Sequence, residues 1–396
     1  MSESTSSFSA TSHANSCTLF RTSFPVAFKT LQDGVAEGVA PGFVAGVWQA
    51  AGPQGGTHDL VAVGNRRLTS ASLLAQPMEV NTVFDLASVT KVMGTATLAA
   101  VLVDRGWITW ETPLQALVPE YRFPEIRLKH LLSHTAGIPA WFPLFEKIRA
   151  HYPLKSIHQV PVSERQKLMR KLVTDIPPEH PVGKVAVYSD LSFLLLGFAL
   201  EEATGMPLDR AVMDFVFRPM GLATAHYVRT TQSVESARNP RVAATEDCPW
   251  RGGVVQGQVH DDNCWAMGGY AGHAGAFADA ADVLKFSVAL MKGFVSPCTL
   301  HKLWTRVDEP VGCDRTLGWD TPSGSEPSFT KRFSPLSVGH LGFTGTSLWI
   351  DPDRQLAVTL LSNRVHPTRE NTLIKAFRGR FHEALWQDLK SVDSSS

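Results

Sequence analysis

Hydrophobic side chains recur at helical spacing near both ends of the chain. Phe28, Leu31 and Val35 repeat every three or four residues and Gly38 follows as a C-terminal stop, so the pattern predicts an amphipathic helix over about 25–37. A second set with the same periodicity predicts a final amphipathic helix, and its members are Leu373, Ile374, Phe377, Phe381 and Leu385.

Short apolar runs separated by turn residues lie beside both helices. Residues 43–48 and 60–63 flank a stretch rich in glycine, which predicts two strands around a turn. Residues 347–350 and 356–361 flank the turn 351–354, which predicts a hairpin. Strands are therefore expected from the two ends of the chain, and they can join one sheet.

Between these ends the chain changes to helical segments broken by proline and glycine, from Leu114 to about Ala271. Residues 190–204 form the clearest predicted helix there, because they are apolar nearly all round and Gly205 follows them. The predicted fold class is α/β (α+β). An antiparallel sheet is built from both chain ends with flanking terminal helices, and a mainly helical region is inserted between them.

This layout predicts a single domain over residues 23–390. Its sheet part comprises residues 23–110 and 278–390, and its helical part comprises residues 111–277. The chain has 396 residues, of which 44% are hydrophobic, so it can bury a substantial core.

Charge and composition argue against several classes of function. Lys and Arg number 37 and so do Asp and Glu, which gives a net charge of zero and does not indicate nucleic acid or an anionic membrane surface as a partner. No apolar run reaches transmembrane length. The serine-rich termini, 1–22 and 391–396, are expected to be disordered, and the first lacks the basic start and apolar run of a secretory signal.

The cysteines match neither a disulfide framework nor a zinc pattern, because they are odd in number and widely spaced: Cys17, Cys248, Cys264, Cys298 and Cys313. With the absence of a signal sequence, this favours a reducing, cytoplasmic setting and leaves export by another route open. The composition does not indicate an oligomeric state.

Ser88 and Lys91 stand three residues apart at the start of an apolar segment that ends at Asp104. On a helix they share one face, and the free N–H groups of the helix start would stabilise negative charge at Ser88. Burial would disfavour the charged form of Lys91. Ser-x-x-Lys is a signature of acyl transfer. The alternative is a buried serine at a helix start followed by an exposed lysine, and this stretch alone does not decide between them.

The same spacing recurs at Ser328 and Lys331. Ser328 follows Pro322, Gly324 and Pro327, and no helical run comes after it. We interpret this second occurrence as a loop.

A serine activated by a lysine needs a second proton carrier and donors for an oxyanion. Tyr188 stands with Asp190 directly before the apolar helix, and the alternative is that Asp190 only caps the helix while Tyr188 packs. The stretch 339–346 holds three glycines before a strand, which would expose backbone N–H groups. Its alternative is a bulge or turn.

Two histidine-containing stretches were considered as metal sites. His260, Asp261, Asp262 and His273 do not stand at helical i, i+4 spacing, and no further cluster completes a coordination shell. A glycine-rich loop that lines a cleft, with Asp279 capping the next helix, is favoured there.

His130 and His134 do stand four residues apart, but a turn follows them at once, so a structural loop is favoured. We therefore expect a metal at neither stretch.

Taken together, Ser88 with Lys91, Tyr188 with Asp190, and the stretch His340–Gly342 stand in the order and rough spacing of three motifs of a known superfamily. The chain resembles the serine β-lactamases and penicillin-binding proteins, in the branch of class C β-lactamases, D-alanyl-D-alanine peptidases and related esterases. The resemblance runs from about Pro25 to Leu389. Further stretches that carry it are 84–88, 130–139, 219–222 and 348–352.

Within that branch, residues 260–277 and 342–346 look most like a group that includes N-acetylmuramoyl-L-alanine amidases. The resemblance implies that Ser88 is the acylated nucleophile, that Lys91 and Tyr188 share the proton transfers, and that neither a metal nor an organic cofactor takes part. It also implies an oxyanion hole formed by the N–H groups of Ser88 and Phe343. Residues implied to contact the substrate are Asp190, His340, Gly342, Thr344 and His273.

Three residues depart from the family pattern. Asp190 stands where asparagine is usual, and its carboxylate would keep Lys91 protonated and weaken it as a base. His340 replaces the lysine of the third motif, and Leu341 replaces a threonine whose hydroxyl helps to hold a substrate carboxylate. These departures weaken the case for β-lactamase activity more than the case for hydrolysis.

The predicted function is that of a serine hydrolase that cleaves an amide or ester bond through an acyl-enzyme. The expected partner is a small-molecule substrate, a muropeptide or a related ester or amide. One alternative is a carboxylesterase of broad specificity, since esterases and amidases use the same machinery. Another is a non-catalytic protein that binds wall fragments.

Overall fold

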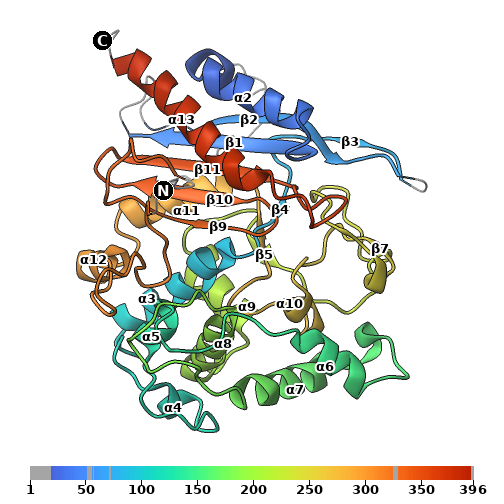
Figure 1. The fold of residues 1–396 in the computed structure, drawn as a ribbon, viewed down its shortest axis with the longest axis vertical. Coiled ribbons are helices and arrows are strands. Elements are labelled where there is room, and N and C mark those ends of the chain that lie inside the picture. The colour runs from blue at the N-terminus through green and yellow to red at the C-terminus, as the bar shows by residue number, and fades with distance from the viewer. Residues whose placement is uncertain (1–18, 51–55, 57, 71–72, 324–328, 394–396) are drawn as a thin grey trace, which may run out of the picture.

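A six-stranded antiparallel sheet forms the upper half of the protein in the computed structural model, which describes residues 19–50, 56, 58–70, 73–323 and 329–393 (Figure 1). Its strands follow the order β3-β2-β1-β11-β10-β9. They are β1 (Gly42–Gln49), β2 (His58–Arg67), β3 (Gln76–Pro77), β9 (Val338–Leu341), β10 (Ser347–Asp351) and β11 (Leu356–Ser362).

The two ends of the chain meet in the middle of this sheet. Strand β1 pairs with β11 from Phe43 to Gln49, so that Val44 lies opposite Leu361, and on its other edge β1 pairs with β2. The apolar runs predicted as strands are therefore strands, and β10 and β11 form the predicted hairpin. This confirms the fold class, an antiparallel sheet drawn from both chain ends.

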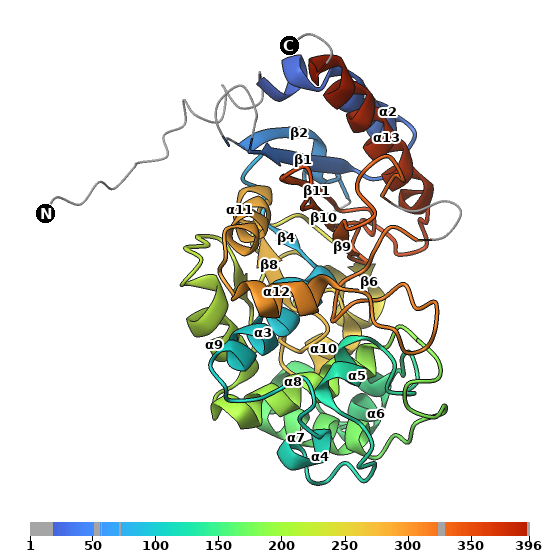
Figure 2. The ribbon, with the colours of Figure 1, turned by 90° about the vertical axis from the view of Figure 1, so that its left-hand side faces the viewer.

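Helices cover both faces of the sheet (Figures 1 and 2). On the outer face α2 (Pro25–Ala36) packs along α13 (Ile374–Asp393), and on the inner face α11 (Ala280–Met291) lies across β1 and β11. The outer helices approach closely because Gly34 has no side chain. A Cβ atom there would lie 2.5 Å from the ring of Phe377, which itself stacks on Phe43 with ring centroids 4.8 Å apart.

A second, three-stranded sheet connects this layer to the helical region. Its order is β4-β8-β5, with β4 (Phe84–Asp85), β8 (Ala276–Ala278) and β5 (His226–Tyr227). Strands β6 (Asp247–Cys248) and β7 (Gly253–Val254) form a separate pair.

The segment after β4 is the first helix of the lower half. It is a π-helix over Lys91–Ala96 that continues as α3 (Thr97–Asp104), so it ends at the predicted residue. The other α-helices described in this part of the protein are α4 (Leu114–Leu117), α5 (Leu128–Leu132), α6 (Leu144–His151), α7 (Val162–Thr174), α8 (Asp190–Thr204), α9 (Leu208–Val212), α10 (Asp262–Ala266) and α12 (Pro297–Trp304).

Helix α8 is the axis of the helical region. Its residues from Leu191 to Leu200 are all buried, which explains why its sequence is apolar nearly all round. Gly205 ends the helix in a left-handed conformation with φ of 66°. Among the described residues no single helix is long and apolar enough to cross a membrane, and only α8 together with residues 208–217, a pair bent by 72°, passes that test of length and composition.

The predicted disordered tails are too long at both ends. Residues 19–23 are helical, and Phe20 is fully buried with its ring 5.0 Å from that of Phe24. At the other end α13 continues to Asp393, past the predicted limit of 390. At the N-terminal end, the buried contact of Phe20 with Phe24 thus orders residues that composition alone assigns to a tail. The division into parts at residues 110 and 277 stays a prediction.

The close contact between α2 and α13 generates a prediction of stability. Replacing Gly34 by valine forces two methyl groups against Phe377, and we expect the free energy of unfolding to fall by about 1–3 kcal/mol, the usual cost of overpacking. Urea denaturation followed by circular dichroism measures the change. Ala36→Val, an exposed position in the same helix, is the control and should change the free energy by about 0.5 kcal/mol or less. Equal effects of the two substitutions would contradict the prediction.

Candidate active site

Ser88 sits in a tight turn between β4 and the helix that carries Lys91. The turn depends on Ala87, which adopts a left-handed backbone conformation with φ of 46°, uncommon for a residue with a side chain. The buried carboxylate of Asp85 connects this turn to the segment that contains His260. It accepts a hydrogen bond from the N–H of Ala87 at 2.8 Å and another from the N–H of His260 at 2.6 Å. The nucleophile candidate is therefore presented at a rigid corner.

Lys91 is fully buried, and its ammonium group has three acceptors. Its Nζ lies 3.0 Å from Ser88 Oγ, 2.6 Å from Asp190 Oδ1 and 3.2 Å from the carbonyl oxygen of His273. The Tyr188 hydroxyl is a further side-chain partner of the ammonium group. The lysine thus bridges the nucleophile turn, the start of α8 and the loop before β8.

The protonation of Lys91 differs from what its burial alone predicts. Burial acts to lower the pKa of Lys91, but the negative charge of Asp190 and the hydroxyl of Tyr188 outweigh it, so the pKa is raised. Burial thus disfavours the charged form of Lys91, as expected, but it does not decide the net direction of the pKa shift. The Asp190 carboxylate keeps Lys91 protonated, as expected from the sequence, and Lys91 is therefore an ammonium group at neutral pH.

Tyr188 stands beside Lys91 because the start of α8 is firmly anchored. Ser189, and not Asp190, is the N-cap of α8, since its hydroxyl oxygen accepts a hydrogen bond from the N–H of Ser192 at 3.0 Å. Lys91 Nζ lies 4.9 Å from the centroid of the Tyr188 ring. Burial raises the pKa of the Tyr188 hydroxyl although Lys91 opposes the effect, so this side chain is a neutral phenol.

His134 holds the Tyr188 segment in place, a role that the sequence did not suggest. Its Nδ1 accepts a hydrogen bond from the N–H of Ser189 at 3.1 Å, and its carbonyl oxygen accepts one from the N–H of Val187 at 2.9 Å. Its ring lies 4.7 Å from that of Tyr188. The predicted structural loop is present, but the left-handed backbone of His134, with φ of 60°, which turns it toward Tyr188, has no sequence signature.

The third motif lies on β9 and packs directly on the nucleophile turn. A Cβ atom at Gly342 would lie 2.0 Å from Thr346 Oγ1 and 2.6 Å from the carbonyl oxygen of Leu86, so only glycine fits. Thr344 was expected to bind substrate. Its buried hydroxyl instead donates to the carbonyl oxygen of Asp85 at 2.8 Å, and Thr344 does not line the cleft.

Phe343 and Ser88 present backbone N–H groups that donate to no group within the described part of the chain. Phe343 is held by Arg364, whose Nε donates to the Phe343 carbonyl oxygen at 2.6 Å and whose guanidinium lies 4.2 Å from the ring centroid. The ring of His260 also stacks on the Phe343 ring, with the two ring centroids 5.8 Å apart.

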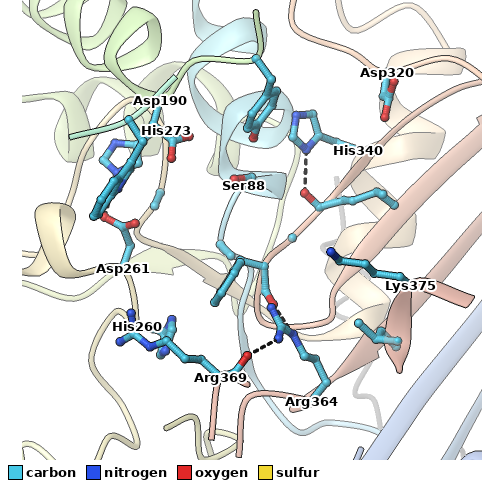
Figure 3. A pocket seen from close by; sticks show the side chains of 18 of the residues that line it. Ser88, Asp190, His260, Asp261, His273, Asp320, His340, Arg364, Arg369 and Lys375 are labelled. Carbon is cyan, nitrogen blue, oxygen red and sulfur yellow. Dashed lines mark hydrogen bonds and ion pairs between the residues drawn. The ribbon is translucent and has the colours of Figure 1, made fainter. Parts of the chain in front are cut away.

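A cleft of about 660 Å³ opens over Ser88, between the edge of the sheet and the helical region (Figure 3). Asp190 and His273 lie on one side of Ser88, and His340 and Asp320 lie on the other. The structure thus brings together most of the predicted site residues, namely Ser88, Tyr188, Asp190, His273, His340, Gly342 and Phe343, with Lys91 buried beneath them.

Several charged residues of the cleft carry no sequence signature. Arg315 and Asp320 precede β9, and those from the segment after β11 are Arg364, Arg369, Lys375 and Arg378. They come from loops and from the start of α13, where no motif or periodicity marks a charged residue as facing inward.

The candidate metal ligands in the stretch 260–273 instead bond to each other, to Arg369 and to the start of α10. His273 Nε2 lies 2.8 Å from Asp261 Oδ1, and Asp261 also caps α10. Asp262 pairs with Arg369 at 3.0 Å. Within the described ranges no group of three or more His, Cys, Asp or Glu side chains is arranged to hold a metal ion.

The loop that was favoured over a metal site is present. It lines the cleft, and Asp279 caps α11 as predicted. Ser328, the second candidate serine, lies outside the described residues.

Comparison with known proteins places most of the chain in one family. The Beta-lactamase family profile matches residues 28–380. Putative D-alanyl-D-alanine carboxypeptidases from Salmonella agona (strain SL483) and Salmonella typhimurium are each 30% identical over 333 residues, which cover 76% of this chain and 74% of theirs.

Solved structures with the same fold are more distant in sequence. The hydrolase EstCE1, described as having promiscuous acyltransferase activity, matches with a TM-score of 0.69 at 20% identity, over 93% of this chain and all of its own. A penicillin-binding protein from Bacillus halodurans matches with a TM-score of 0.63 at 21% identity, over 87% of this chain and 98% of its own.

The ion pair under Ser88 generates a prediction for the pKa of Lys91. In Asp190→Asn the negative charge is lost while burial remains, so the pKa of Lys91 should fall by about 1–3 units. Titration of the Lys91 side chain by NMR in lysine-labelled protein measures it. In the control Asp261→Asn, where the lost carboxylate pairs with His273 and not with Lys91, the shift should be about half a unit or less. An unchanged pKa in Asp190→Asn would show that the ion pair does not set it.

Proposed function

The chain belongs to the beta-lactamase family, and on that premise we propose that it is a serine hydrolase that cleaves an amide or ester bond through an acyl-enzyme on Ser88. The observation that carries the proposal is the placement of Ser88 Oγ, 3.0 Å from a buried lysine and at the floor of a cleft of about 660 Å³. A hydroxyl is a weak nucleophile, and a neighbouring proton acceptor is the usual means of activating it.

Lys91 and Tyr188 act as one unit in this proposal. As an ammonium and a neutral phenol, neither can take the proton of Ser88, so the pair must first release one proton to solvent. The deprotonated pair then removes the Ser88 proton during attack and returns it to the leaving group. Acylation should therefore quicken as the pH rises, and Asp190 shifts that rise to higher pH because it stabilises the ammonium form.

The backbone N–H groups of Ser88 and Phe343 are the proposed oxyanion hole. Support comes from their lack of partners among the described residues and from the clamp that Arg364 forms on the Phe343 carbonyl. A water molecule would then attack the acyl-enzyme with the same proton carriers in reverse roles.

A muropeptide or a related small amide is the proposed substrate. The names of the putative D-alanyl-D-alanine carboxypeptidases support a wall-derived peptide, and the cleft volume suits a small molecule. A broad-specificity carboxylesterase is the second candidate. It is favoured by the third motif, where burial and the charges of Lys91 and Arg315 hold the pKa of His340 well below its usual value and Leu341 offers no hydrogen bond. A non-catalytic wall-fragment binder is disfavoured by the intact set of Ser88, Lys91 and Tyr188.

Labelling with a fluorophosphonate tests the nucleophile. Intact-mass analysis should show one adduct on the native protein, lost in Ser88→Ala and kept in the control Ser328→Ala. Turnover of a muropeptide and of a p-nitrophenyl ester, measured side by side, then separates amidase from esterase. No adduct on the native protein would favour the non-catalytic alternative, and an adduct on Ser328 would refute the assignment.

The third motif generates a prediction on β-lactams. A substrate carboxylate placed beside neutral His340 and Leu341 lacks charge-assisted partners, at a cost of about 1–3 kcal/mol for each one missing. Penicillins should therefore acylate the protein slowly. His340→Lys combined with Leu341→Thr should raise kcat/KM for a penicillin about tenfold or more and change that of a neutral ester little.

Efficient penicillin hydrolysis by the native protein would contradict this account. It would place the anion site on Lys375 or Arg364, which line the cleft.

A further inference from the structure

His340 lines the cleft, and its imidazole carries a buried nitrogen that has no hydrogen-bond partner among the described residues. The side chain is buried, and its Nδ1 lies 2.9 Å from the carbonyl oxygen of Leu341. A carbonyl oxygen only accepts hydrogen bonds, so Nδ1 must carry the ring proton. Nε2 is then a lone-pair acceptor, and no group in the described part of the chain bonds to it. A buried acceptor of this kind calls for a donor from a ligand.

The surroundings of His340 keep the ring neutral. Burial and the positive charges of Lys91 and Arg315 hold its pKa well below the usual value, and Arg378 acts in the same direction. A protonated ring would have offered a second N–H to the cleft, as the lysine of related proteins does. The neutral ring offers an electron pair instead.

Asp320 adds a carboxylate to the same side of Ser88 (Figure 3). It is tied to β9 by paired backbone hydrogen bonds with Gly339 at 2.8 and 2.9 Å. Its Oδ1 accepts from the N–H of Thr321 at 3.0 Å and lies 3.3 Å from Arg315 Nη1, whereas Oδ2 has no hydrogen-bond or ion-pair partner among the residues described. Two residues that line the cleft beside β9 therefore each carry an acceptor without a partner in the described part of the chain, His340 Nε2 and Asp320 Oδ2.

Two cations near this corner are paired with carboxylates, whereas the buried Arg378 donates to the backbone carbonyl oxygens of Gly342 and Thr346. Arg315 lies between two carboxylates, Asp320 at 3.3 Å and Asp314 at 3.8 Å, and Lys91 pairs with Asp190 at 2.6 Å. A ligand carboxylate placed here would face a lone pair and a negative charge, whereas a ligand ammonium would face two acceptors.

We propose that the corner formed by His340 and Asp320 recognises a hydrogen-bond donor of the substrate, a protonated amine above all, close to the bond that is cleaved. The inference rests on the proposed function, since it takes the bond that acylates Ser88 as the reference point. It narrows the substrate class to amides or esters that carry an amine on this side and separates the protein from peptidases that hold a free carboxylate there.

Binding measured by NMR tests the proposal without any turnover. Three N-acetyl-D-alanyl amides are compared, made with ethylenediamine, D-alaninamide and D-alanine, so that they end in an ammonium, a carboxamide or a carboxylate. Each is titrated into Ser88→Ala protein labelled with ¹⁵N-histidine, and the shift of His340 Nε2 reports binding. We expect an unprotonated Nε2 in the free protein. The ammonium compound should bind about tenfold more tightly than the carboxamide, as one charge-assisted hydrogen bond provides, and the carboxylate most weakly.

Two variants locate the effect. Asp320→Asn should remove most of the advantage of the ammonium compound over the carboxamide, whereas the control Asp314→Asn, which changes the other carboxylate beside Arg315 outside the cleft, should preserve it to within about twofold. A protonated Nε2, tightest binding of the carboxylate, no binding of any of the three compounds, or an unaltered advantage in Asp320→Asn would each overturn the proposal. Failure of Ser88 to react with a phosphonate would refute the proposed function and is a separate result.

Discussion

The buried ion pair between Lys91 and Asp190 is the interaction on which the rest of the site depends. An ammonium group with no exposed surface is very unfavourable unless it is fully bonded, and Lys91 obtains its three acceptors from three different parts of the chain. The nucleophile turn, the start of α8 and the loop before β8 must therefore all be correctly placed around Lys91 for its burial to be tolerated. The same bond that stabilises the site keeps its base protonated, so stability and reactivity are opposed at Lys91.

Much of the fold could be predicted because its patterns are local. The helix at 25–36, the strands of the central sheet and the apolar helix α8 each have a periodicity that burial imposes on a single element. The ordered ends could not be predicted in the same way. Phe20 is buried only because distant residues cover it, and a serine-rich composition does not reveal such contacts.

In the candidate site, too, some residues could be predicted from local patterns and others could not. Ser88, Lys91 and Tyr188 could be found because the chemistry fixes their types and spacing. The turn of His134 toward Tyr188 rests on a left-handed backbone at a histidine, and the approach of Arg315 and Asp320 rests on where a loop runs. Neither is encoded in a short pattern, since both depend on tertiary contacts. For Lys91 the direction of the pKa shift could be expected only by weighing burial against Asp190, and the structure shows that the charge prevails.

The pairing of β1 with β11 sets an order of events during synthesis. The N–H of Gly42 on β1 donates to the side chain of Asn363, 321 residues further along the chain, and β11 lies in the centre of the sheet between β1 and β10. While the ribosome is still making the middle of the protein, β1 and β2 expose an unpaired, apolar edge of the kind that recruits other strands. Closing so long a loop is slow. A nascent chain of this protein would therefore remain open to aggregation until β11 has left the ribosome, and shielding by a chaperone would matter most in that interval.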